Sequence, residues 1–228
     1  MNKTPVLCIK KLAKTYMMPS KKNGVKVFSN LDLVIETPRI IAIMGESGSG
    51  KTTLLNLIGM LDKPTKGEIF YNGIERSNIK NPALFRRKNI GFVFQNHLLQ
   101  DEFSALENIA LPLLLLNMPF KKAFSQAEKI LDEVGLSHRK NHKPSEMSGG
   151  ENQRIAIARA LVHNPSYILA DEPTGNLDYE NQSKVNKLFI ELNLKFCKTV
   201  IIATHSVELA NLCQEIWILK KGRLLKKR

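Results

Sequence analysis

The segment with the clearest chemistry is a glycine-rich loop that ends in a lysine and a threonine. It reads Gly45-Glu46-Ser47-Gly48-Ser49-Gly50-Lys51-Thr52 and fits the phosphate-loop pattern G-x-x-x-x-G-K-[ST] in full. Glycines allow backbone N–H groups to approach an anion, and Lys51 adds a full charge for the β- and γ-phosphates. Thr52 offers a hydroxyl to Mg²⁺. The loop predicts binding of ATP and Mg²⁺, with these contacts: Gly45, Glu46, Ser47, Gly48, Ser49, Gly50, Lys51, Thr52 and Thr53.

Two adjacent carboxylates follow a second predicted strand, at 167–170. Neighbouring side chains on an extended chain point in opposite directions, so the two acids can have separate tasks. We expect Asp171 to hold Mg²⁺ together with Thr52, and Glu172 to polarise the attacking water. The alternative is a solvated strand edge, which often carries acidic residues.

A double glycine opens another predicted helix, in the segment Ser148-Gly149-Gly150-Glu151. As local structure this is a capping box, in which Ser148 caps the helix and Glu151 reaches back. A helix start without side chains also leaves bare N–H groups and a positive dipole end for an anion. One chain with one phosphate loop does not need a second anion site on the same ATP. We therefore expect this segment to contact the ATP of another copy.

The elements that position these residues alternate between strands and helices. The phosphate loop lies between a buried strand at 40–44 and an apolar helix at 52–61, which is the context that the motif demands. From residue 95 to about 159 the pattern is helical, which indicates an insertion. A parallel sheet with crossover helices is the economical fold for this order. The other predicted strands are 6–12, 31–35, 67–71, 90–94 and 199–203, and the other predicted helices are 104–116, 122–134, 151–163 and 180–194.

Composition excludes some classes of protein and leaves others open. The chain has 228 residues, of which 43% are hydrophobic and 24% charged, as in a globular protein. Its net charge of +13 is compatible with nucleic-acid binding, but the lysines are scattered as on a solvated surface. The longest apolar stretch, 109–120, is interrupted by one asparagine and two prolines and is shorter than the ~20 residues of a bilayer span. We expect reduced cysteines in a cytoplasmic protein that reaches a membrane only through a partner.

Taken together and in this order, the motifs resemble those of the ATP-binding subunits of ABC transporters. The phosphate loop matches the Walker A motif of that family, and Ile168 to Glu172 matches Walker B. Met147 to Glu151 matches the signature, which more usually reads L-S-G-G-Q. Four further matches are Gln95 for the Q-loop, 176–178 for the D-loop, 204–206 for the switch-histidine loop, and Tyr16 for the aromatic residue that stacks on adenine.

The resemblance implies a fold and an activity. The fold is a P-loop NTPase (RecA-like) α/β core with an antiparallel β subdomain and an inserted α-helical subdomain. It would form one ABC ATPase domain over 1–228, with the core at 1–94 and 160–228 and the helical signature subdomain at 95–159. The implied activity is ATP hydrolysis coupled to transport by two chains that enclose two ATP molecules between them.

The resemblance also assigns roles. His205 would touch the γ-phosphate and orient the water with Glu172, and Gln95 would sense Mg²⁺ and that water. Asp178 would link the two ATP sites, and Tyr16 would stack on adenine. The implied catalytic residues are Glu172, His205, Gln95 and Lys51, the implied metal ligands are Thr52, Gln95 and Asp171, and the contacts to the second chain's ATP are Ser148, Gly149, Gly150 and Glu151.

Finer segments resemble the branch of the family that drives release of lipoproteins from the inner membrane towards the outer membrane. They are 92–99, 103–114, 135–146 and 171–178. The branches for macrolide or peptide export and for cell division share most of these motifs and stay open as alternatives. By this resemblance, membrane permease subunits dock near residues 95–110 and hold the chain at the cytoplasmic face of the inner membrane.

A nucleic-acid-associated ATPase of the same superfamily is a distant alternative, because the segment between Thr52 and Ser148 is short and compact. We expect no nucleic-acid partner.

Overall fold

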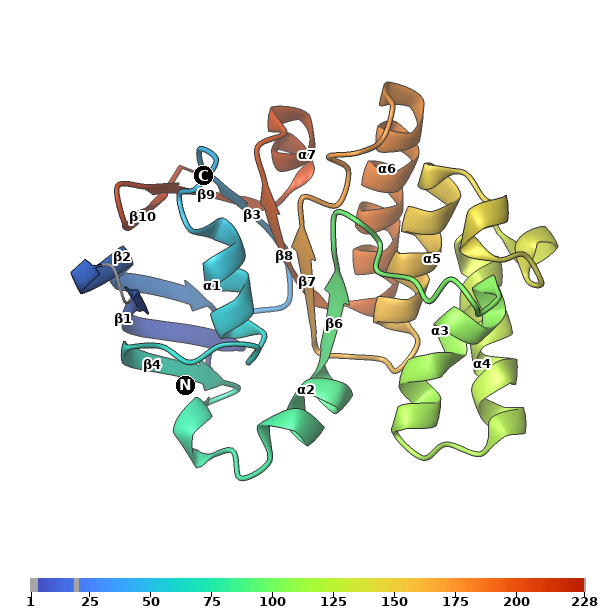
Figure 1. Cartoon of the computed structure of the whole chain (residues 1–228), viewed down its shortest axis with the longest axis horizontal. Helices are drawn as coiled ribbons and strands as arrows, with labels where there is room; N and C mark the ends of the chain where they lie inside the picture. Colours follow the sequence, from blue (N-terminus) through green and yellow to red (C-terminus); the bar gives the residue numbers. More distant parts are fainter. Residues whose placement is uncertain (1–3, 19–20, 228) are drawn as a thin grey trace. The chain divides into compact units, whose positions relative to one another are not determined.

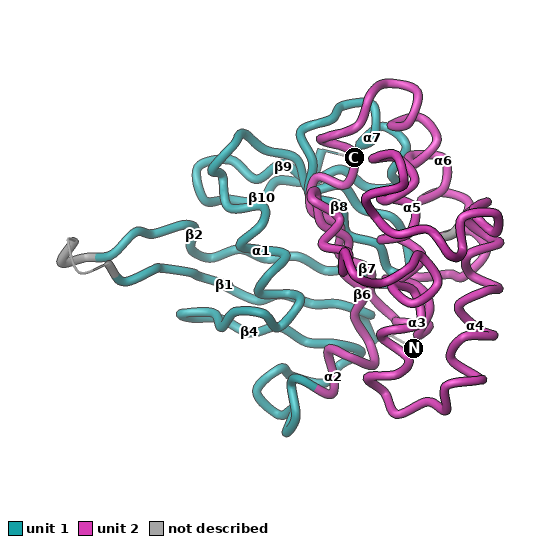
Figure 2. The backbone as a smooth tube through the Cα atoms, turned by 45° about the vertical axis from the view of Figure 1, so that its right-hand side comes forward, with its two compact units in different colours: residues 1–83, 199–228 teal, residues 84–198 magenta. Residues whose placement is uncertain are grey.

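The structure of the chain is a computed structural model that describes residues 4–18 and 21–227, without the side chains of 18, 21–23 and 192. It begins with strands, carries a run of helices in its middle and ends with strands, as Figure 1 shows. The chain divides into two compact units, which Figure 2 distinguishes by colour. Unit 1 combines residues 1–83 with 199–228, and unit 2 consists of residues 84–198.

Unit 1 contains an antiparallel sheet with strand order β2-β1-β4-β5. Apolar residues alternate with polar ones in its strands, so that one face is buried: Leu7 and Ile9 are buried, as are Leu31, Leu33 and Ile35. A turn at Asn72-Gly73 connects two of the strands. The strands are β1 (Leu7–Met18), β2 (Lys21–Ile35), β4 (Lys66–Tyr71) and β5 (Ile74–Glu75).

Unit 1 also contains a group of strands in the order β10-β9-β3-β8. The strand before the phosphate loop, β3 (Ile40–Met44), lies between two parallel neighbours and is apolar along its length because both of its faces are covered. Helix α1 (Lys51–Ile58) packs against β8 and helix α7 (Val207–Leu212) against β3. The other strands of this group are β8 (Thr199–Thr204), β9 (Glu215–Lys220) and the antiparallel β10 (Arg223–Lys226).

Unit 2 contains a parallel pair of strands and four long helices, drawn in magenta in Figure 2. The signature helix α5 packs against β6 and against α3, α4 and α6. The predicted helical segment 95–159 lies within this unit. Its elements are β6 (Ile90–Val93), α3 (Ala105–Leu115), α4 (Phe120–Glu133), α5 (Gly149–Leu161), β7 (Tyr167–Asp171) and α6 (Tyr179–Phe196).

The structure extends the prediction in places where the sequence pattern is polar. Strand β1 continues to Met18 and β2 begins at Lys21, because backbone pairing between them carries the hairpin beyond its apolar part. Helix α2 (Pro82–Asn89) has no buried residue, so no apolar periodicity marked it in advance. The elements after residue 206, α7, β9 and β10, were also not predicted. Among the helices in the described part of the chain, none is both long and apolar enough to cross a bilayer.

His163 makes the stability of unit 2 dependent on pH. Its Nε2 lies 3.2 Å from the carbonyl oxygen of Ile90, while its buried Nδ1 has no hydrogen-bond partner among the described residues. Burial holds the pKa of His163 below its ordinary value. Below about pH 6.5 the unfolded chain binds a proton that the folded chain refuses, so stability falls as the pH falls. We expect the free energy of unfolding to decrease by up to about 1.4 kcal/mol per pH unit in this range.

The measurement is urea unfolding at pH 7.5 and pH 5.5 for the wild type and for His163→Gln. The glutamine amide can still donate to Ile90 but cannot be protonated, so this variant should lose less stability at pH 5.5 than the wild type. His138 lies at the surface, and His138→Gln is the matched control. Equal losses in the wild type and in His163→Gln would contradict the assignment.

Candidate nucleotide site

The phosphate loop connects β3 to α1 in unit 1, and its geometry leaves room for an anion. Helix α1 starts after Gly50 with no side-chain cap and no acidic residue in its first turn. Gly48 has a φ of +74°, and a Cβ placed on it would meet no atom within 4 Å. The first N–H groups of α1 and the positive end of its dipole therefore face a space that protein side chains do not fill.

Lys51 lies under this loop with its charge directed to the loop backbone. The residue is 8% exposed, and its Nζ donates to the carbonyl oxygens of Gly45 at 2.8 Å and Glu46 at 3.3 Å. The buried hydroxyl of Ser49 has no hydrogen-bond partner among the described residues. Thr52 and Thr53 follow in the first turn of α1. This is a donor set that fits a chain of phosphate groups and one of its metal ions.

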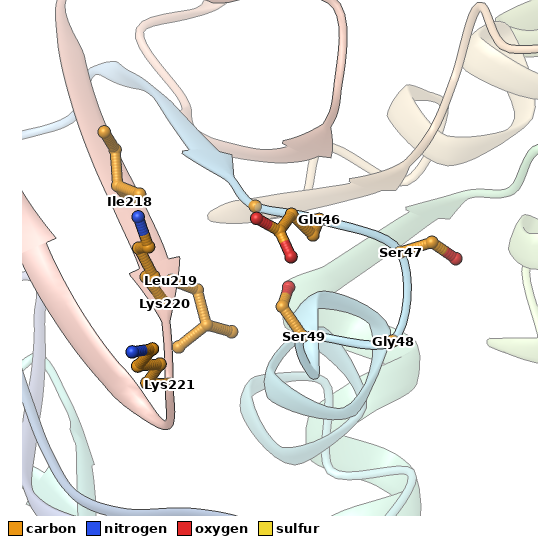
Figure 3. A pocket seen from close by; sticks show the side chains of 9 residues that line it. Glu46, Ser47, Gly48, Ser49, Ile218, Leu219, Lys220 and Lys221 are labelled. Carbon is orange, nitrogen blue, oxygen red and sulfur yellow. The ribbon is translucent and has the colours of Figure 1, made fainter.

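The loop lines a cavity of about 410 Å³. Figure 3 shows Glu46 and Ser49 on one side of the cavity and strand β9 with Lys220 on the other, while Ser47 points away from β9. A second cavity of about 410 Å³ reaches Gly48 and Ser49 from the side of Lys26 and Lys221. Cations therefore surround the phosphate loop on both flanks.

Tyr16 is fixed by two charged side chains that no sequence motif marks. Its hydroxyl donates to Oδ2 of Asp62 at 2.8 Å, and Nζ of Lys14 lies 4.5 Å from the centre of its ring. Lys14 and Asp62 form an ion pair at 2.7 Å. Tyr16 is 37% exposed, so part of the ring surface remains accessible. No short sequence pattern could predict this group, because Asp62 is 46 residues from Tyr16.

The pKa values of this group show that its charges are stabilised. Burial and the hydrogen bond with Asp62 raise the pKa of Tyr16, against a smaller opposing effect of Thr53. For Asp62, burial alone would raise the pKa, but hydrogen bonds from Lys14 and Tyr16 outweigh it and hold the pKa below its ordinary value. At neutral pH the Asp62 carboxylate is therefore charged and the Tyr16 hydroxyl is its donor.

His205 follows β8 in unit 1 and is exposed. The residues beside it are ordered: the Ser206 N–H donates to Oγ1 of Thr204 at 3.0 Å, and the Ser206 hydroxyl caps α7 by accepting from the N–H of Leu209. The imidazole is thus carried on a tight turn between a buried strand and a capped helix.

The two predicted carboxylates lie at the carboxyl end of β7 in unit 2. Asp171 is the last residue of the strand and is half-buried. Glu172 follows with a φ of +44°, a left-handed conformation that is uncommon for a residue with a side chain. Its carbonyl oxygen accepts from the N–H of Gly175 at 3.0 Å, which closes a turn. Strain of this kind is concentrated at functional positions in proteins.

The Q-loop glutamine contacts the D-loop within unit 2. Nε2 of Gln95 donates to Oδ1 of Asn176 at 2.9 Å, and Nδ2 of Asn176 donates to Oδ1 of Asn96 at 2.9 Å. The side chain of Gln95 thus connects a segment that leaves β6 with one that follows β7. The sequence motifs mark both loops but not this contact between them.

The predicted capping box at the start of α5 is confirmed. The Ser148 hydroxyl accepts from the N–H of Glu151, and the Glu151 carboxylate accepts from the N–H of Ser148. The other oxygen of Glu151 pairs with Nε of Arg139 at 2.8 Å. Burial opposes ionisation of Glu151, but the bonds from Ser148 and Arg139 outweigh it and lower its pKa. A glutamate at this signature position therefore gains an ionic partner that a glutamine would not have.

Asp178 and Gly150 meet through one asparagine. Asp178 caps α6 by accepting from the N–H of Asn181 at 2.9 Å and from its Nδ2 at 2.7 Å. A Cβ on Gly150 would lie 2.3 Å from Oδ1 of the same asparagine, so a larger residue at this position would have to displace the Asn181 side chain. The hydrogen bonds from Asn181 also lower the pKa of Asp178. Within unit 2 the signature and the D-loop thus form one contiguous patch.

Two polar side chains of the signature helix hold the segment that follows Gln95. His97 and Leu98 in this segment both have a positive φ, at 56° and 50°. Arg159 donates to their carbonyl oxygens at 2.7 and 2.6 Å, and Gln153 hydrogen-bonds the His97 ring. The sequence pattern does not reveal this clamp, since its donors lie more than 50 residues from the loop they hold.

The predicted site residues thus belong to both units. Unit 1 contains Tyr16, the phosphate loop with Lys51, Thr52 and Thr53, and His205, whereas unit 2 contains Gln95, Ser148, Gly149, Gly150, Glu151, Asp171, Glu172 and Asp178. Within each unit, a strand end presents polar residues beside a helix start. A phosphate loop between a buried parallel strand and an uncapped helix defines a P-loop nucleotide-binding protein.

Comparison with known proteins identifies the family of P-loop proteins to which the chain belongs. Residues 28–175 match the model of the ABC transporter family, and the chain belongs to that family. It is 46% identical over 219 residues to the lipoprotein-releasing system ATP-binding protein LolD of Syntrophus aciditrophicus, covering 95% of this chain and 97% of that protein. It is 44% identical over 222 residues to LolD of Blochmanniella floridana, covering 96% and 94% of the two chains.

A solved structure supports the same assignment. The chain is similar to a dimeric bacterial ABC transporter cassette, MJ0796, with a TM-score of 0.86, 39% sequence identity, and coverage of 97% of this chain and 99% of that one. The same cassette is also known as a dimer in a post-hydrolysis state bound to ADP and Pi, with the same TM-score and identity. The ABC ATPase fold predicted from the motifs is therefore confirmed.

Proposed function

We propose that this chain is the ATP-hydrolysing subunit of an ABC transporter that releases lipoproteins from the inner membrane for transfer towards the outer membrane. The observation that carries the ATPase activity is the uncapped, glycine-rich start of α1 with Lys51 beneath it. The cargo is supported by relatives named for lipoprotein release, which are about 45% identical over nearly the whole chain.

ATP would bind to unit 1 through its phosphates and its base. Lys51 would exchange the carbonyl oxygens of Gly45 and Glu46 for the β- and γ-phosphate oxygens, a stronger, charge-assisted interaction. The N–H groups at the start of α1 would bind the same phosphates. The exposed part of the Tyr16 ring would stack on adenine.

Hydrolysis would require residues of both units. Thr52 and Asp171 offer the oxygen ligands that Mg²⁺ prefers, and Gln95 offers a third. When bound, Mg²⁺ neutralises charge on the phosphates. Glu172 would accept a proton from the attacking water, and His205 would orient that water beside the γ-phosphate. These roles require that the carboxyl end of β7 lies next to the phosphate loop, which is part of the proposal.

Two copies of the chain would enclose each ATP. The start of α5 after Ser148 supplies backbone N–H groups, because Gly149 and Gly150 carry no side chains there. These groups would bind the γ-phosphate on the second copy, and Asp178, next to this patch, would link the two sites. The dimeric state of the similar cassette supports this arrangement.

The membrane permease would dock on the segment 95–110, at the cytoplasmic face of the inner membrane. This segment exposes Leu98 by 55% and Phe103 by 38%, which gives a permease an apolar contact surface. Arg159 and Gln153 hold the same segment, so movement there would be transmitted to the signature helix.

The proposal is tested by isolating the tagged chain from membranes in mild detergent and identifying the proteins that elute with it. We expect integral membrane subunits and, after reconstitution into lipid vesicles, release of a lipoprotein that requires Mg-ATP. A complex with a permease that moves a different cargo would retain the ATPase assignment and remove the lipoprotein assignment. The Glu172→Gln variant provides a matched complex without turnover.

Tyr16, held by Lys14 and Asp62, should contribute to the affinity for the adenine of ATP. Base stacking on an aromatic side chain contributes about 1–3 kcal/mol in nucleic-acid complexes. Asp62→Asn replaces the charged acceptor of the Tyr16 hydroxyl and weakens the hold on Lys14, so the ring is less well positioned. We expect ATP affinity to fall by about 1 kcal/mol, or ~5-fold. Equilibrium titration with ATP measures it.

A matched ligand and a double variant separate positioning from general damage. Inorganic tripolyphosphate has no base, so its affinity should be the same for Asp62→Asn and the wild type. In a Tyr16→Ala background, Asp62→Asn should have no further effect on ATP affinity, because the residue acts through the ring. An equal loss for tripolyphosphate would show instead that the variant disturbs the phosphate loop.

A further inference from the structure

A groove in unit 2, away from every residue assigned to ATP, combines positive charge with apolar surface. It has a volume of about 820 Å³ and lies between α4 and the carboxyl end of α6. Four lysines line it against a single glutamate: Lys121, Lys122 and Lys129 from α4 and Lys195 from α6, with Glu133 as the one acid. Its apolar lining comes from Met118, Ile130 and Phe196.

Most of the positive charge in this groove is not neutralised by the protein. Lys195 pairs with Glu133 at 2.5 Å and also lies 5.8 Å from the ring centre of Phe196. Lys121, Lys122 and Lys129 are exposed and form no ion pair with any residue in the described part of the chain. Three free ammonium groups around one cavity create a local attraction for an anion.

Helical spacing brings two of these lysines, Lys122 and Lys129, onto one face of α4. Lys122, Gln126, Lys129 and Glu133 follow one another at intervals of four, three and four residues, so they form one row beside the groove. The opposite face of the helix is buried through Ala123, Ala127 and Leu131. Lys122 and Lys129 therefore lie along the outward face of α4, where both line the groove.

An exposed aromatic ring lies at the start of α4, outside the lining of the groove. Phe120 is 66% exposed and stacks on Phe124, with ring centres 4.1 Å apart. Leu115, at the end of the preceding helix α3, is 52% exposed. Beside the lysines, the groove itself offers Met118, Ile130 and Phe196, and apolar side chains next to lysines are characteristic of surfaces that contact the headgroup region of a membrane.

We propose that this groove binds anionic phospholipid at the membrane surface, with headgroup phosphates at Lys121, Lys122 and Lys129 and acyl surface against Met118, Ile130 and Phe196. The proposal rests on the proposed function in one respect, which is that a permease brings the chain to the inner membrane. An anionic leaflet attracts basic segments, and the attraction decays within a Debye length of about 8–10 Å. The groove would thus orient the ATPase against the lipid as well as against the permease.

The test is co-sedimentation of the purified full chain with vesicles of phosphatidylglycerol and phosphatidylcholine, or of phosphatidylcholine alone. We expect binding only to the anionic vesicles, with strong weakening between 0.1 and 0.5 M salt. Lys122→Gln with Lys129→Gln should lower the binding constant by about fivefold per lysine, or roughly 25-fold together. The control, Lys184→Gln with Lys187→Gln, removes two exposed lysines from α6 outside the groove and should bind as the wild type does.

Several results would overturn the proposal. They are equal binding to both kinds of vesicle, equal weakening by the control pair, and groove-dependent binding of a soluble acidic peptide without binding to vesicles. Met118→Ser should weaken vesicle binding at both salt concentrations, since an apolar contact is not screened, and no effect would remove the acyl contact. ATPase activity of the lysine variants without lipid should equal that of the wild type. Because no permease is present, failure here leaves the lipoprotein assignment untouched.

Discussion

Glu172→Gln should bind ATP as tightly as the wild type and hydrolyse it about 10²–10⁴ times more slowly. The substitution keeps the size of the side chain and removes only its ability to accept a proton from water. The strained turn at Glu172, with its φ of +44°, is expected to stay in place because the backbone hydrogen bond to Gly175 does not involve the side chain. Nucleotide binding should persist since the phosphate loop is unchanged.

The variant should also accumulate as a dimer with Mg-ATP, because in the proposed arrangement two copies enclose each ATP and the variant does not hydrolyse it. Sedimentation velocity with and without Mg-ATP measures this, and release of phosphate measures turnover. Glu191→Gln, which changes an exposed glutamate of α6, is the control and should turn over ATP normally. A Glu172→Gln chain that stays monomeric with bound ATP would disprove the shared-site arrangement.

The parts of the candidate site whose chemistry is local could be proposed from the sequence. The phosphate loop, the acidic end of β7 and the capping box at Ser148 each depend on residues within eight positions of one another. Their strands and helices could also be predicted, because buried apolar runs such as 40–44 have a strong periodic signal. These predictions needed no knowledge of which segments meet in space.

The remaining features depend on contacts between distant segments or on polar surfaces. The support of Tyr16 by Asp62, and the clamp from Arg159 to His97 and Leu98, join residues 46 to 62 positions apart. Helix α2 buries nothing and gives no periodic pattern. The lysine row of α4 could be counted in the sequence, but its cavity exists only because Lys195 and Phe196 of α6 lie opposite.

Lys51→Ala should weaken the binding of ATP itself, in contrast to the loss of turnover alone in Glu172→Gln. Hydrogen bonds to a charged group contribute about 1.5–3 kcal/mol, so we expect the dissociation constant to rise roughly 10- to 150-fold. The lysine is 8% exposed and its Nζ donates to two carbonyl oxygens of the loop, so the alanine variant loses both of these contacts with the loop. Equilibrium titration with ATP and with tripolyphosphate measures the change.

Comparing ATP with tripolyphosphate, and Lys51→Ala with a control variant, shows whether the loss of affinity comes from the contact between Lys51 and the phosphates. The loss should be the same for ATP and tripolyphosphate, because Lys51 acts on the phosphates, whereas Asp62→Asn should affect ATP alone. Lys66→Ala, which removes an exposed lysine of unit 1, should change neither affinity. If Lys51→Ala bound ATP as the wild type does, the phosphate-loop assignment would be wrong. Lys51→Ala should weaken both ligands and Asp62→Asn only the ligand that has a base. Together the two variants would show how much of the binding energy of ATP comes from its phosphates and how much from its adenine.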